Sequence, residues 1–439
     1  MRKVLICSPR FPPTNAADMH RVRQSLPYFC DYGWQPTVLA AEPQYCEIPL
    51  DPLLEVSVPQ KVRVKRVAAL DVRKARRVGL ANFDLRVLPF MARAGERLLS
   101  EEQFDLVYFS TTAFNLLSLA PYWKARFKVP YVIDLQDPWL SDYYQRPGSP
   151  LPPGGRLKYG VSQLLARLLE PLTLRHATHI ISVSPAYPKM LMARYKWMKA
   201  ENFTVLSFGA PQADFILLRR ESISQTIFDP TDGYRHWIYV GVVGEIMHLA
   251  LRAFFTALQQ ARRTTTDYKD LRLHFIGTDY ATDHRARKTV EPIAQACGVA
   301  DLVEEHPQRI PYFEALQCLL DADALIVPGS DDPGYTASKL YPYILAQKPM
   351  LAIFHEESSV NDVLHCTKAG VAISFATGED PAALAQRIEQ AWFTPQAWKT
   401  VPNTDWNAFA PYTAQEMTRR QCEVFEKAIK TQKNSGPNL

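Results

Sequence analysis

Short apolar segments alternate with amphipathic segments along most of this chain, and polar or glycine-rich loops separate them. In the first half, residues 3–9 predict a buried strand, and residues 17–32 predict the helix that follows it. Further apolar segments predict more strands, at residues 36–40, 104–111, 129–139, 177–187 and 203–211. Short strands without strict alternation, separated by helices, are typical of a parallel sheet with both faces covered.

The same pattern restarts near residue 206. Residues 236–245 predict a strand followed by a glycine loop, and residues 247–262 predict the next helix. Further strands are predicted at residues 271–280, 322–331, 348–354 and 371–375, and further helices at 312–322, 338–347, 380–393 and 412–430. The predicted fold class is therefore α/β, with two doubly wound, Rossmann-like domains joined by a hinge near residues 206–211. In such sheets, ligands bind outside the carboxyl ends of the strands.

The composition agrees with a globular protein of two domains. A chain of 439 residues is too long for one ordinary core, and 47% hydrophobic with 22% charged residues is typical of soluble folded proteins. No run approaches the roughly 18 to 20 apolar residues that a transmembrane helix needs. The first apolar run ends at Pro9 and Arg10 without a cleavage site, so we interpret it as a strand rather than a targeting signal.

Cysteine and histidine spacing predicts neither disulfides nor a metal site. The seven cysteines are odd in number and scattered, without a C-x-x-C pair, which favours reduced thiols in a cytoplasmic protein. The ten histidines show no H-E-x-x-H or similar ligand spacing. We expect no metal and no cofactor.

Charge is distributed unevenly along the chain. Residues 1–200 carry a net charge of +12 and the remainder −7, which together give the formal +5 of the whole chain. The basic excess concentrates in residues 61–80, among leucine and valine residues. Such a segment is typical either of a surface that contacts anionic lipid or of a solvated helix face, and the sequence leaves both interpretations open. No recognition motif accompanies the charge, so we expect no nucleic acid partner.

Residues 331–352, DDPGYTASKLYPYILAQKPMLA, place small and hydroxylic residues directly before a predicted helix. Gly334 allows close backbone approach, Thr336 and Ser338 offer hydroxyl donors, and Lys339 adds a positive charge. A helix start also presents unpaired backbone N–H groups, so the segment would suit a phosphate. Serine and threonine are also the preferred N-caps of ordinary helices, and the segment alone does not exclude that interpretation.

Several segments, in order, resemble glycosyltransferases of the GT-B fold and the large family 4 type, also called group 1. They are ICSPRFPPTNAADMHRVRQ (6–24), FDLVYFS (104–110), VIDLQDPW (132–139), SFGAPQADF (207–215), YVGVVGE (239–245) and ASKLYPYILAQKPML (337–351). The last segment is the most specific, since the family typically has P-S-K-L-x-E-Y-L-A-x-G-K-P-x-L there. The resemblance covers nearly the whole chain.

The resemblance implies an acceptor-side domain of residues 1–205, completed by a returning C-terminal helix of residues 411–439. It implies a nucleotide-sugar domain of residues 206–410, with the reaction in the cleft between the two domains. The donor substrate would be a nucleotide-sugar, and the acceptor a glycan, a lipid-linked precursor or a small molecule. The sugar would be transferred without a metal, usually with retention of the anomeric configuration.

Positions that match the family motifs are the candidate site residues. Asp137 matches a family aspartate at a strand end, where a carboxylate can position a hydroxyl or the donor sugar; it also suits a turn before Pro138. We assign it the catalytic role. The acceptor-side candidates are Asn15, His20, Arg21 and Ser110, and the donor candidates are Gly241, Gly244, Arg252, Arg309, Gly334, Tyr335, Thr336, Ala337, Ser338 and Lys339.

The chain departs from the family pattern in the predicted donor site. Many members carry glutamates where this chain has Gly334 and Pro342, and neither residue can accept a side-chain hydrogen bond. The basic pair that usually follows the YVG strand is also missing. Arg252 is then either a displaced diphosphate ligand or an ordinary surface residue.

Three functions follow from this pattern. The first is a cytoplasmic glycosyltransferase, with peripheral contact at the inner face of the membrane if the basic segment meets anionic lipid. The missing glutamates favour a second, a glycosyltransferase-like subunit that binds without catalysis in polysaccharide assembly. The third is a nucleotide-sugar epimerase on the same fold, which would need no acceptor site.

Overall fold

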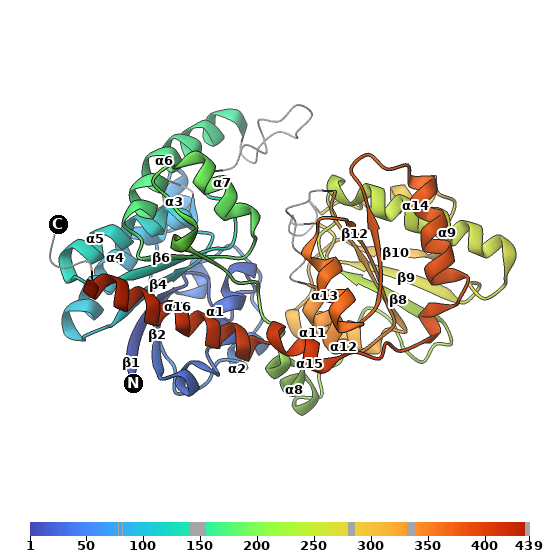
Figure 1. The fold of residues 1–439 in the computed structure, drawn as a ribbon, viewed down its shortest axis with the longest axis horizontal. Helices are drawn as coiled ribbons and strands as arrows, with labels where there is room; N and C mark the ends of the chain where they lie inside the picture. The colour runs from blue at the N-terminus through green and yellow to red at the C-terminus, as the bar shows by residue number, and fades with distance from the viewer. Residues whose placement is uncertain (78, 81, 141–154, 280–285, 332–338, 435–439) are drawn as a thin grey trace. The chain divides into compact units, whose positions relative to one another are not determined.

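The computed structural model describes the 439 residues except 78, 81, 141–154, 280–285, 332–338 and 435–439 (Figure 1). The chain forms two compact units: residues Met1–Gly209 with Ala414–Leu439, and residues Ala210–Thr413. Each unit contains one parallel sheet with helices on its faces. The α/β fold class predicted from the apolar segments is confirmed.

The sheet of the first unit has seven parallel strands in the order β3-β2-β1-β4-β5-β6-β7. The strands are β1 (Arg2–Cys7), β2 (Trp34–Ala41), β3 (Arg63–Val67), β4 (Leu106–Ser110), β5 (Tyr131–Leu135), β6 (His179–Ser182) and β7 (Phe203–Val205). Strand order changes direction between β1 and β4, which is where ligands of such sheets bind. The edge strand β3 lies in the basic segment, where exposed Arg63 and Lys65 alternate with more buried residues. Part of that segment is therefore a strand, and its charges protect a sheet edge.

Helices cover both faces of this sheet. They are α1 (His20–Ser25), α2 (Leu53–Val56), α3 (Val72–Arg77), α4 (Phe83–Glu101), α5 (Leu119–Phe127), α6 (Gly155–His176), α7 (Ala186–Arg194) and α16 (Ala414–Asn434). Consecutive residues of β4 point to opposite faces: Tyr108 packs on Phe425 of α16, and Phe109 packs on Trp123 of α5. The sheet is therefore buried on both sides, which explains its continuous apolar segments.

The helix predicted over residues 17–32 is interrupted. The structure has a 3₁₀ turn at Ala17–Met19, α1 at His20–Ser25 and a second 3₁₀ turn at Phe29–Tyr32. Pro27 lies in the gap, and its ring and missing N–H prevent α1 from continuing. The prediction of one helix was wrong, because the apolar pattern continues past Pro27 whereas an α-helix cannot continue through this proline.

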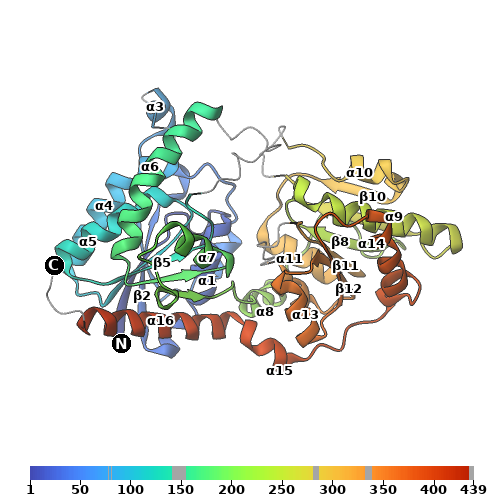
Figure 2. The ribbon, with the colours of Figure 1, turned by 45° about the horizontal axis from the view of Figure 1, so that its top comes forward.

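Helix α16, from the end of the chain, belongs to the first unit and lies along it in Figures 1 and 2. Its Phe425 ring contacts the rings of Phe29, Trp34 and Tyr108, with centroids 6.1, 5.2 and 5.0 Å away. The hydroxyl of Ser25 also donates to Gln421 of α16, at 3.1 Å. The last segment of the chain thus completes the core of the first unit.

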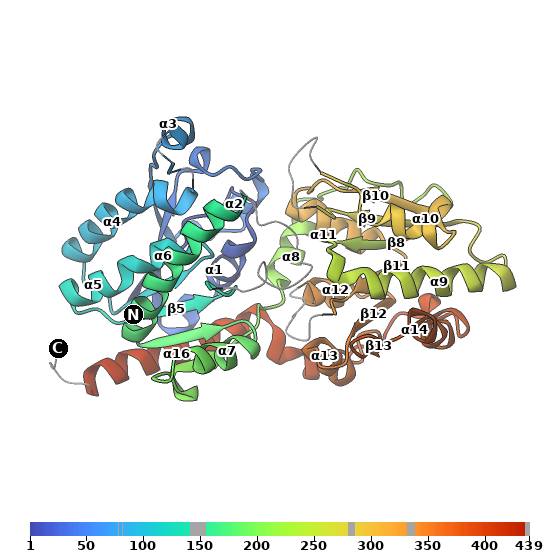
Figure 3. The same ribbon diagram turned by 90° about the horizontal axis from the view of Figure 1, so that it is seen from above.

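The second unit has six parallel strands in the order β10-β9-β8-β11-β12-β13 (Figure 3). The strands are β8 (Arg235–Val240), β9 (Leu271–Ile276), β10 (Val303–His306), β11 (Ala324–Pro328), β12 (Met350–His355) and β13 (Val371–Phe375). The order changes direction between β8 and β11. Loops at the carboxyl ends of these two strands therefore form the expected ligand position of this unit.

The helices of the second unit are α8 (Gln212–Arg220), α9 (His248–Thr264), α10 (Glu291–Ala296), α11 (Tyr312–Asp321), α12 (Leu340–Ala346), α13 (Ser359–Thr367), α14 (Pro381–Ile388) and α15 (Trp406–Phe409). An aromatic core supports β8 from one face, where Trp237 packs against Trp392 and Phe393. This core fixes β8 against the elements on that face, and a site built on a well-packed strand is held in place. None of the described helices in either unit is long and apolar enough to cross a membrane.

Candidate functional site

Gly241 and Lys339, two residues of the predicted donor site, lie against one another at the carboxyl end of β8. Gly241 has a backbone φ of 150°, and a Cβ atom there would come within 1.9 Å of Lys339 Nζ. The lysine ammonium donates to the Tyr239 hydroxyl at 3.1 Å. Lys339 therefore lies across bare backbone that only a glycine can provide.

Tyr343 fastens α12 to the same strand end. The backbone N–H of Val240 donates to the Tyr343 hydroxyl at 2.6 Å, and this hydroxyl donates to the Val240 carbonyl at 3.2 Å. Tyr343 follows Lys339 by about one helical turn. Its contacts to Val240 therefore also fix the position of the Lys339 backbone relative to the end of β8. The N–H of Asp331, after β11, donates to the Ile246 carbonyl at 2.8 Å. The loops that follow β8 and β11 are thus tied together.

The other donor candidates are placed apart from this pair or lie outside the described residues. Gly334, Tyr335, Thr336, Ala337 and Ser338 belong to the range 332–338, which the structure does not describe. Gly244 has φ −104°, a conformation open to any residue. Arg252 is exposed on α9, and Arg309 is exposed three residues after β10. Of the donor candidates within the described residues, the structure brings together Gly241 and Lys339. Tyr239 and Tyr343, which contact this pair or the same strand end, were not predicted from the sequence because nothing in their spacing indicates such a role.

Asp137 lies two residues beyond the end of β5 in the first unit. Its surface is exposed, although enough protein surrounds the carboxyl to remove part of its solvation. This desolvation, with a smaller contribution from the negative charge of Asp18, raises the pKa of Asp137 to about 6. A carboxyl with such a pKa can accept or release a proton near neutral pH.

Asp18 connects the start of α1 to the loop after β4, at the change in strand order. Its Oδ2 accepts hydrogen bonds from Arg10 Nη1 at 3.1 Å, the Thr111 hydroxyl at 3.0 Å, and both the N–H and hydroxyl of Thr112 at 3.1 Å. Arg10 also stacks on the Phe83 ring, 5.0 Å from its centroid. Arg10 and Asp18 were not among the candidates predicted from the sequence, although two charged residues in a proline-rich segment after a buried strand could have indicated them.

Arg21 and Ser110, both acceptor-side candidates, are fully buried in a network around Asp134. Arg21 Nε and the Ser110 hydroxyl each donate to Asp134 Oδ2 at 2.8 Å. Arg21 also donates to the carbonyl of Leu206, at 2.7 Å, which joins α1 to the segment after β7. These two side chains hold the fold in this arrangement, and contact with an acceptor would require the network to open.

The remaining acceptor-side candidates are His20 and Asn15. His20 is half-buried as the first residue of α1, and its Nδ1 lies 3.2 Å from Arg23 Nη2. Asn15 is buried, and its backbone N–H donates to the Pro49 carbonyl at 2.9 Å. Both lie in the segment that leads from β1 into α1, but the structure shows no role for their side chains in binding.

The match to known families lies in the first unit. Residues 20–209 match the family model of the glycosyl transferase 4-like domain. No curated protein sequence matches the chain.

Solved structures share the fold over nearly the whole chain. HepE of Anabaena in complex with UDP-glucose has a TM-score of 0.60 at 15% identity and covers 97% of this chain and 100% of its own. The trehalose-6-phosphate phosphatase N-terminal domain of Candida albicans has a TM-score of 0.63 at 12% identity, with coverage of 98% and 97%. The lipopolysaccharide outer core galactosyltransferase WaaB has a TM-score of 0.53 at 11% identity, with coverage of 97% and 100%. The resemblance to GT-B-fold glycosyltransferases is confirmed, and at these identities the structural likeness shows the fold alone.

Proposed function

We propose that the chain transfers a sugar from a nucleotide-sugar donor to an acceptor, because residues 20–209 match the family model of the glycosyl transferase 4-like domain. The donor binds to the second unit and the acceptor to the first. The observation that carries this proposal is the position of Lys339 against Gly241.

The reaction releases a nucleoside diphosphate, so negative charge develops on the leaving group. A positive charge held in place before the reaction stabilises that charge without reorganisation. Lys339 supplies such a charge at the carboxyl end of β8, and the missing Cβ of Gly241 leaves the backbone open to a phosphate. The known complexes of HepE contain UDP and UDP-glucose, so these are the first ligands to test here.

Two variants test the donor site by UDP titration. Lys339→Ala should weaken UDP binding by about 10- to 100-fold, since a hydrogen bond to a charged group contributes about 1.5–3 kcal/mol. Gly241→Ala should cause a similar loss, because its new methyl group would displace the lysine. Lys269→Ala is the matched control, since Lys269 is exposed and precedes β9 at the opposite end of the sheet. Unchanged affinity in both site variants would reject the donor site.

In the first unit, we propose that Asp137 positions the reacting hydroxyl or the donor sugar. Its elevated pKa, at a strand end of the family-matching domain, supports this role. Asp137→Asn should then retain UDP affinity and lower transfer by at least about 100-fold, the lower range for a general acid or base. Full turnover of this variant would remove Asp137 from the reaction.

Product analysis separates transfer from the other two functions. Incubation with UDP-glucose and a mixture of glycan and lipid-linked acceptors should yield free UDP and a glycosylated acceptor. Binding without any product would favour the non-catalytic subunit, in line with Gly334 and Pro342 at the glutamate positions. A changed sugar still attached to UDP would favour the epimerase.

An exposed apolar face on α6 supports contact with a membrane. Val161, Leu164, Leu168 and Leu172 are each more than half exposed, at 55%, 60%, 63% and 51%, and their spacing places them on one face of the helix. We call these four residues the α6 stripe. Exposed basic residues flank it on the same helix: Arg156, Lys158, Arg167 and Arg175. The single acidic residue of α6, Glu170, is buried and pairs with Arg194. A basic helix with an apolar face binds anionic lipid, which would bring the enzyme to a lipid-linked acceptor.

A further inference from the structure

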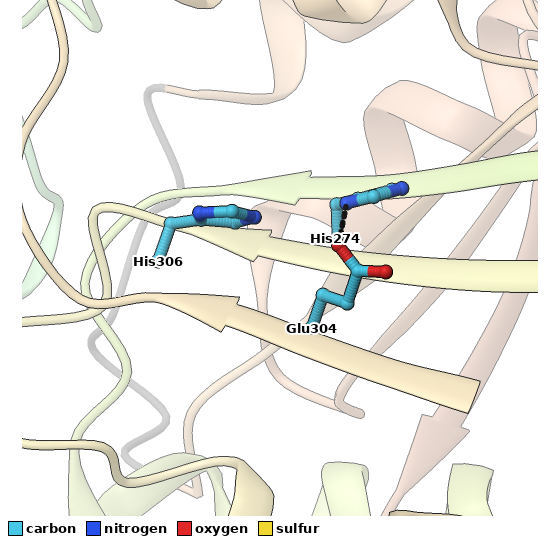
Figure 4. Close-up of side chains that lie close together, drawn as sticks. All are labelled: His274, Glu304 and His306. Atoms are coloured by element: carbon cyan, nitrogen blue, oxygen red, sulfur yellow. Dashed lines mark ion pairs between the residues drawn. The ribbon is translucent and has the colours of Figure 1, made fainter. Parts of the chain in front are cut away.

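Two histidines and a glutamate gather on one face of the sheet edge in the second unit (Figure 4). His274 lies on β9, and Glu304 lies directly opposite it on β10. His306 follows Glu304 by two residues, so both project from the same face of β10. One ligand atom from each side chain lies within 4.8 Å of the other two, and His274 Nδ1 is 3.6 Å from Glu304 Oε2.

Glu305, between the two β10 residues, points to the other face and holds the strand in register. Its carboxylate accepts the backbone N–H groups of Val290 and Glu291, both at 2.9 Å, at the start of α10. It also accepts the Thr278 hydroxyl at 2.6 Å. These contacts fix β10 so that Glu304 and His306 remain on the face of His274.

A chain of hydrogen bonds determines which nitrogen of His274 carries a proton. Asp232 Oδ1 lies 3.0 Å from His236 Nε2, and a carboxylate can only accept, so this nitrogen carries the hydrogen. When the His236 ring is neutral, its Nδ1 is an acceptor, and it lies 2.9 Å from His274 Nε2, which then donates. His274 Nδ1 is left with a lone pair that points toward Glu304.

No donor among the described residues satisfies this lone pair. His274 is 2% exposed, and neither its Nδ1 nor His306 Nε2 has a hydrogen-bond partner among the residues described. The Phe228 ring covers both His236 and His274, with centroids 4.5 and 5.1 Å away. A buried lone pair that faces a carboxylate is unfavourable, and a metal cation between the two groups would satisfy both.

We propose that His274, Glu304 and His306 bind a divalent transition metal of the zinc type, oriented by the Asp232–His236–His274 hydrogen-bond chain. Two imidazoles and one carboxylate form a known zinc ligand set, which leaves one position open for water or a further ligand. A metal-bound histidine usually donates its other N–H to a fixed acceptor, as His274 does to His236.

The fit needs only a small adjustment of two side chains. Ligand atoms around a tetrahedral zinc lie about 3.3 Å apart, given metal–ligand bonds of ~2.0–2.1 Å. The exposed Glu304 and the half-buried His306 can rotate to close the 4.8 Å spacing, while the buried His274 stays fixed. The sequence predicted no metal because these ligands come from two strands and match no local motif.

Zinc titration of the full chain, after removal of metal by a chelator, tests the site. We expect one equivalent of zinc per chain, measured by competition with a chromophoric chelator. Glu304→Gln and His306→Gln should each weaken this binding by about 100-fold or more, the upper range for loss of a supporting group alone. His248→Gln is the matched control, an exposed histidine of the same unit at the start of α9, and should bind like the wild type.

A second variant tests the hydrogen-bond chain without touching a ligand. Asp232→Ala should weaken zinc binding by about 10- to 100-fold, because it removes the acceptor that holds the histidine tautomers. Cobalt bound at the site should give the intense visible absorption of a tetrahedral complex. Absence of stoichiometric zinc binding, or binding that survives the Glu304, His306 or Asp232 substitution unchanged, would overturn the proposal.

Discussion

Asp137 is the described residue in which position and acidity together point most directly to chemistry. It lies two residues beyond the end of β5, and its carboxyl pKa is raised to about 6, so its charge changes over the range from pH 5 to 7. Because the unfolded chain has the ordinary value of 3.8, the folded protein binds this proton more tightly. Stability from this group is therefore present at low pH and is lost as pH rises through 6.

This linkage predicts a pH-dependent effect of Asp137→Asn on the free energy of unfolding. The variant cannot ionise, so relative to the wild type it should gain stability between pH 4 and 7 and show no further gain above pH 7. Urea denaturation at a series of pH values measures the difference. A difference that stays constant across this range would show that the folded-state pKa is not raised.

The Arg21–Asp134 ion pair differs from Asp137 in that neither side chain has access to solvent. Both side chains are fully buried, and Ser110 and Gln136 add hydrogen bonds to the same carboxylate. Arg21→Met should lower the free energy of unfolding by about 3–5 kcal/mol, because it leaves Asp134 buried without its counter-charge. Urea denaturation tests this, and a loss below about 1 kcal/mol would show that the carboxylate is neutralised in another way.

At the scale of elements, the α6 stripe is a helix face that no other described residue of the first unit covers. An apolar face flanked by Arg and Lys residues belongs at the boundary between lipid headgroups and acyl chains. The basic edge strand β3 and helix α3 add to the positive charge of the same unit. Part of the basic segment of residues 61–80 therefore forms β3 and α3, whereas the exposed apolar face lies on α6.

Replacement of the stripe should separate membrane contact from folding. Leu164→Ser with Leu168→Ser should reduce co-sedimentation with anionic vesicles several-fold and leave binding to neutral vesicles as weak as before. Ile216→Ser is the matched control, since Ile216 is 66% exposed on α8 of the second unit and lies outside the stripe. Equal binding of the stripe variant and the wild type would reject a membrane role for α6.

At the scale of the whole molecule, the chain leaves its first unit after Gly209 and returns to it at Ala414. The second unit is therefore continuous in sequence, whereas the first needs both ends of the chain. Helix α16 supplies Phe425, which completes an aromatic cluster with Phe29, Trp34 and Tyr108. Removal of the Phe425 ring should therefore lower the stability of the first unit and leave that of the second unit unchanged.

Phe425→Ala should lower the unfolding temperature of the first unit by about 10 °C. Truncation of a buried Phe costs about 3–5 kcal/mol, and in a unit of this size each kcal/mol shifts the midpoint by about 2–4 °C. Calorimetry should show a second transition at its original temperature, identified by its shift with UDP if the donor site is correct. Lys430→Ala, at an exposed position of α16, is the control. A joint shift of both transitions would mean that the units unfold together.

The sequence by itself determined the parallel architecture, because the spacing of apolar residues is a local property, and its likeness to family motifs offered Gly241 and Lys339 as candidates. It did not determine where helix α1 ends, since Pro27 competes with a continuous apolar pattern. Strand β3 was not predicted from the sequence either. Three of its five side chains are charged, so the alternation of buried and exposed residues does not appear as an apolar pattern.

Only the tertiary structure decided which distant residues meet. Strand order and register bring Lys339 onto Gly241, place Arg21 inside a buried network, and set His274 opposite Glu304 and His306. None of these contacts can be read from spacing, because each joins residues from separate elements. Burial then decides their chemistry: it turns Arg21 into a structural residue, raises the pKa of Asp137, and leaves a histidine lone pair that a metal can use.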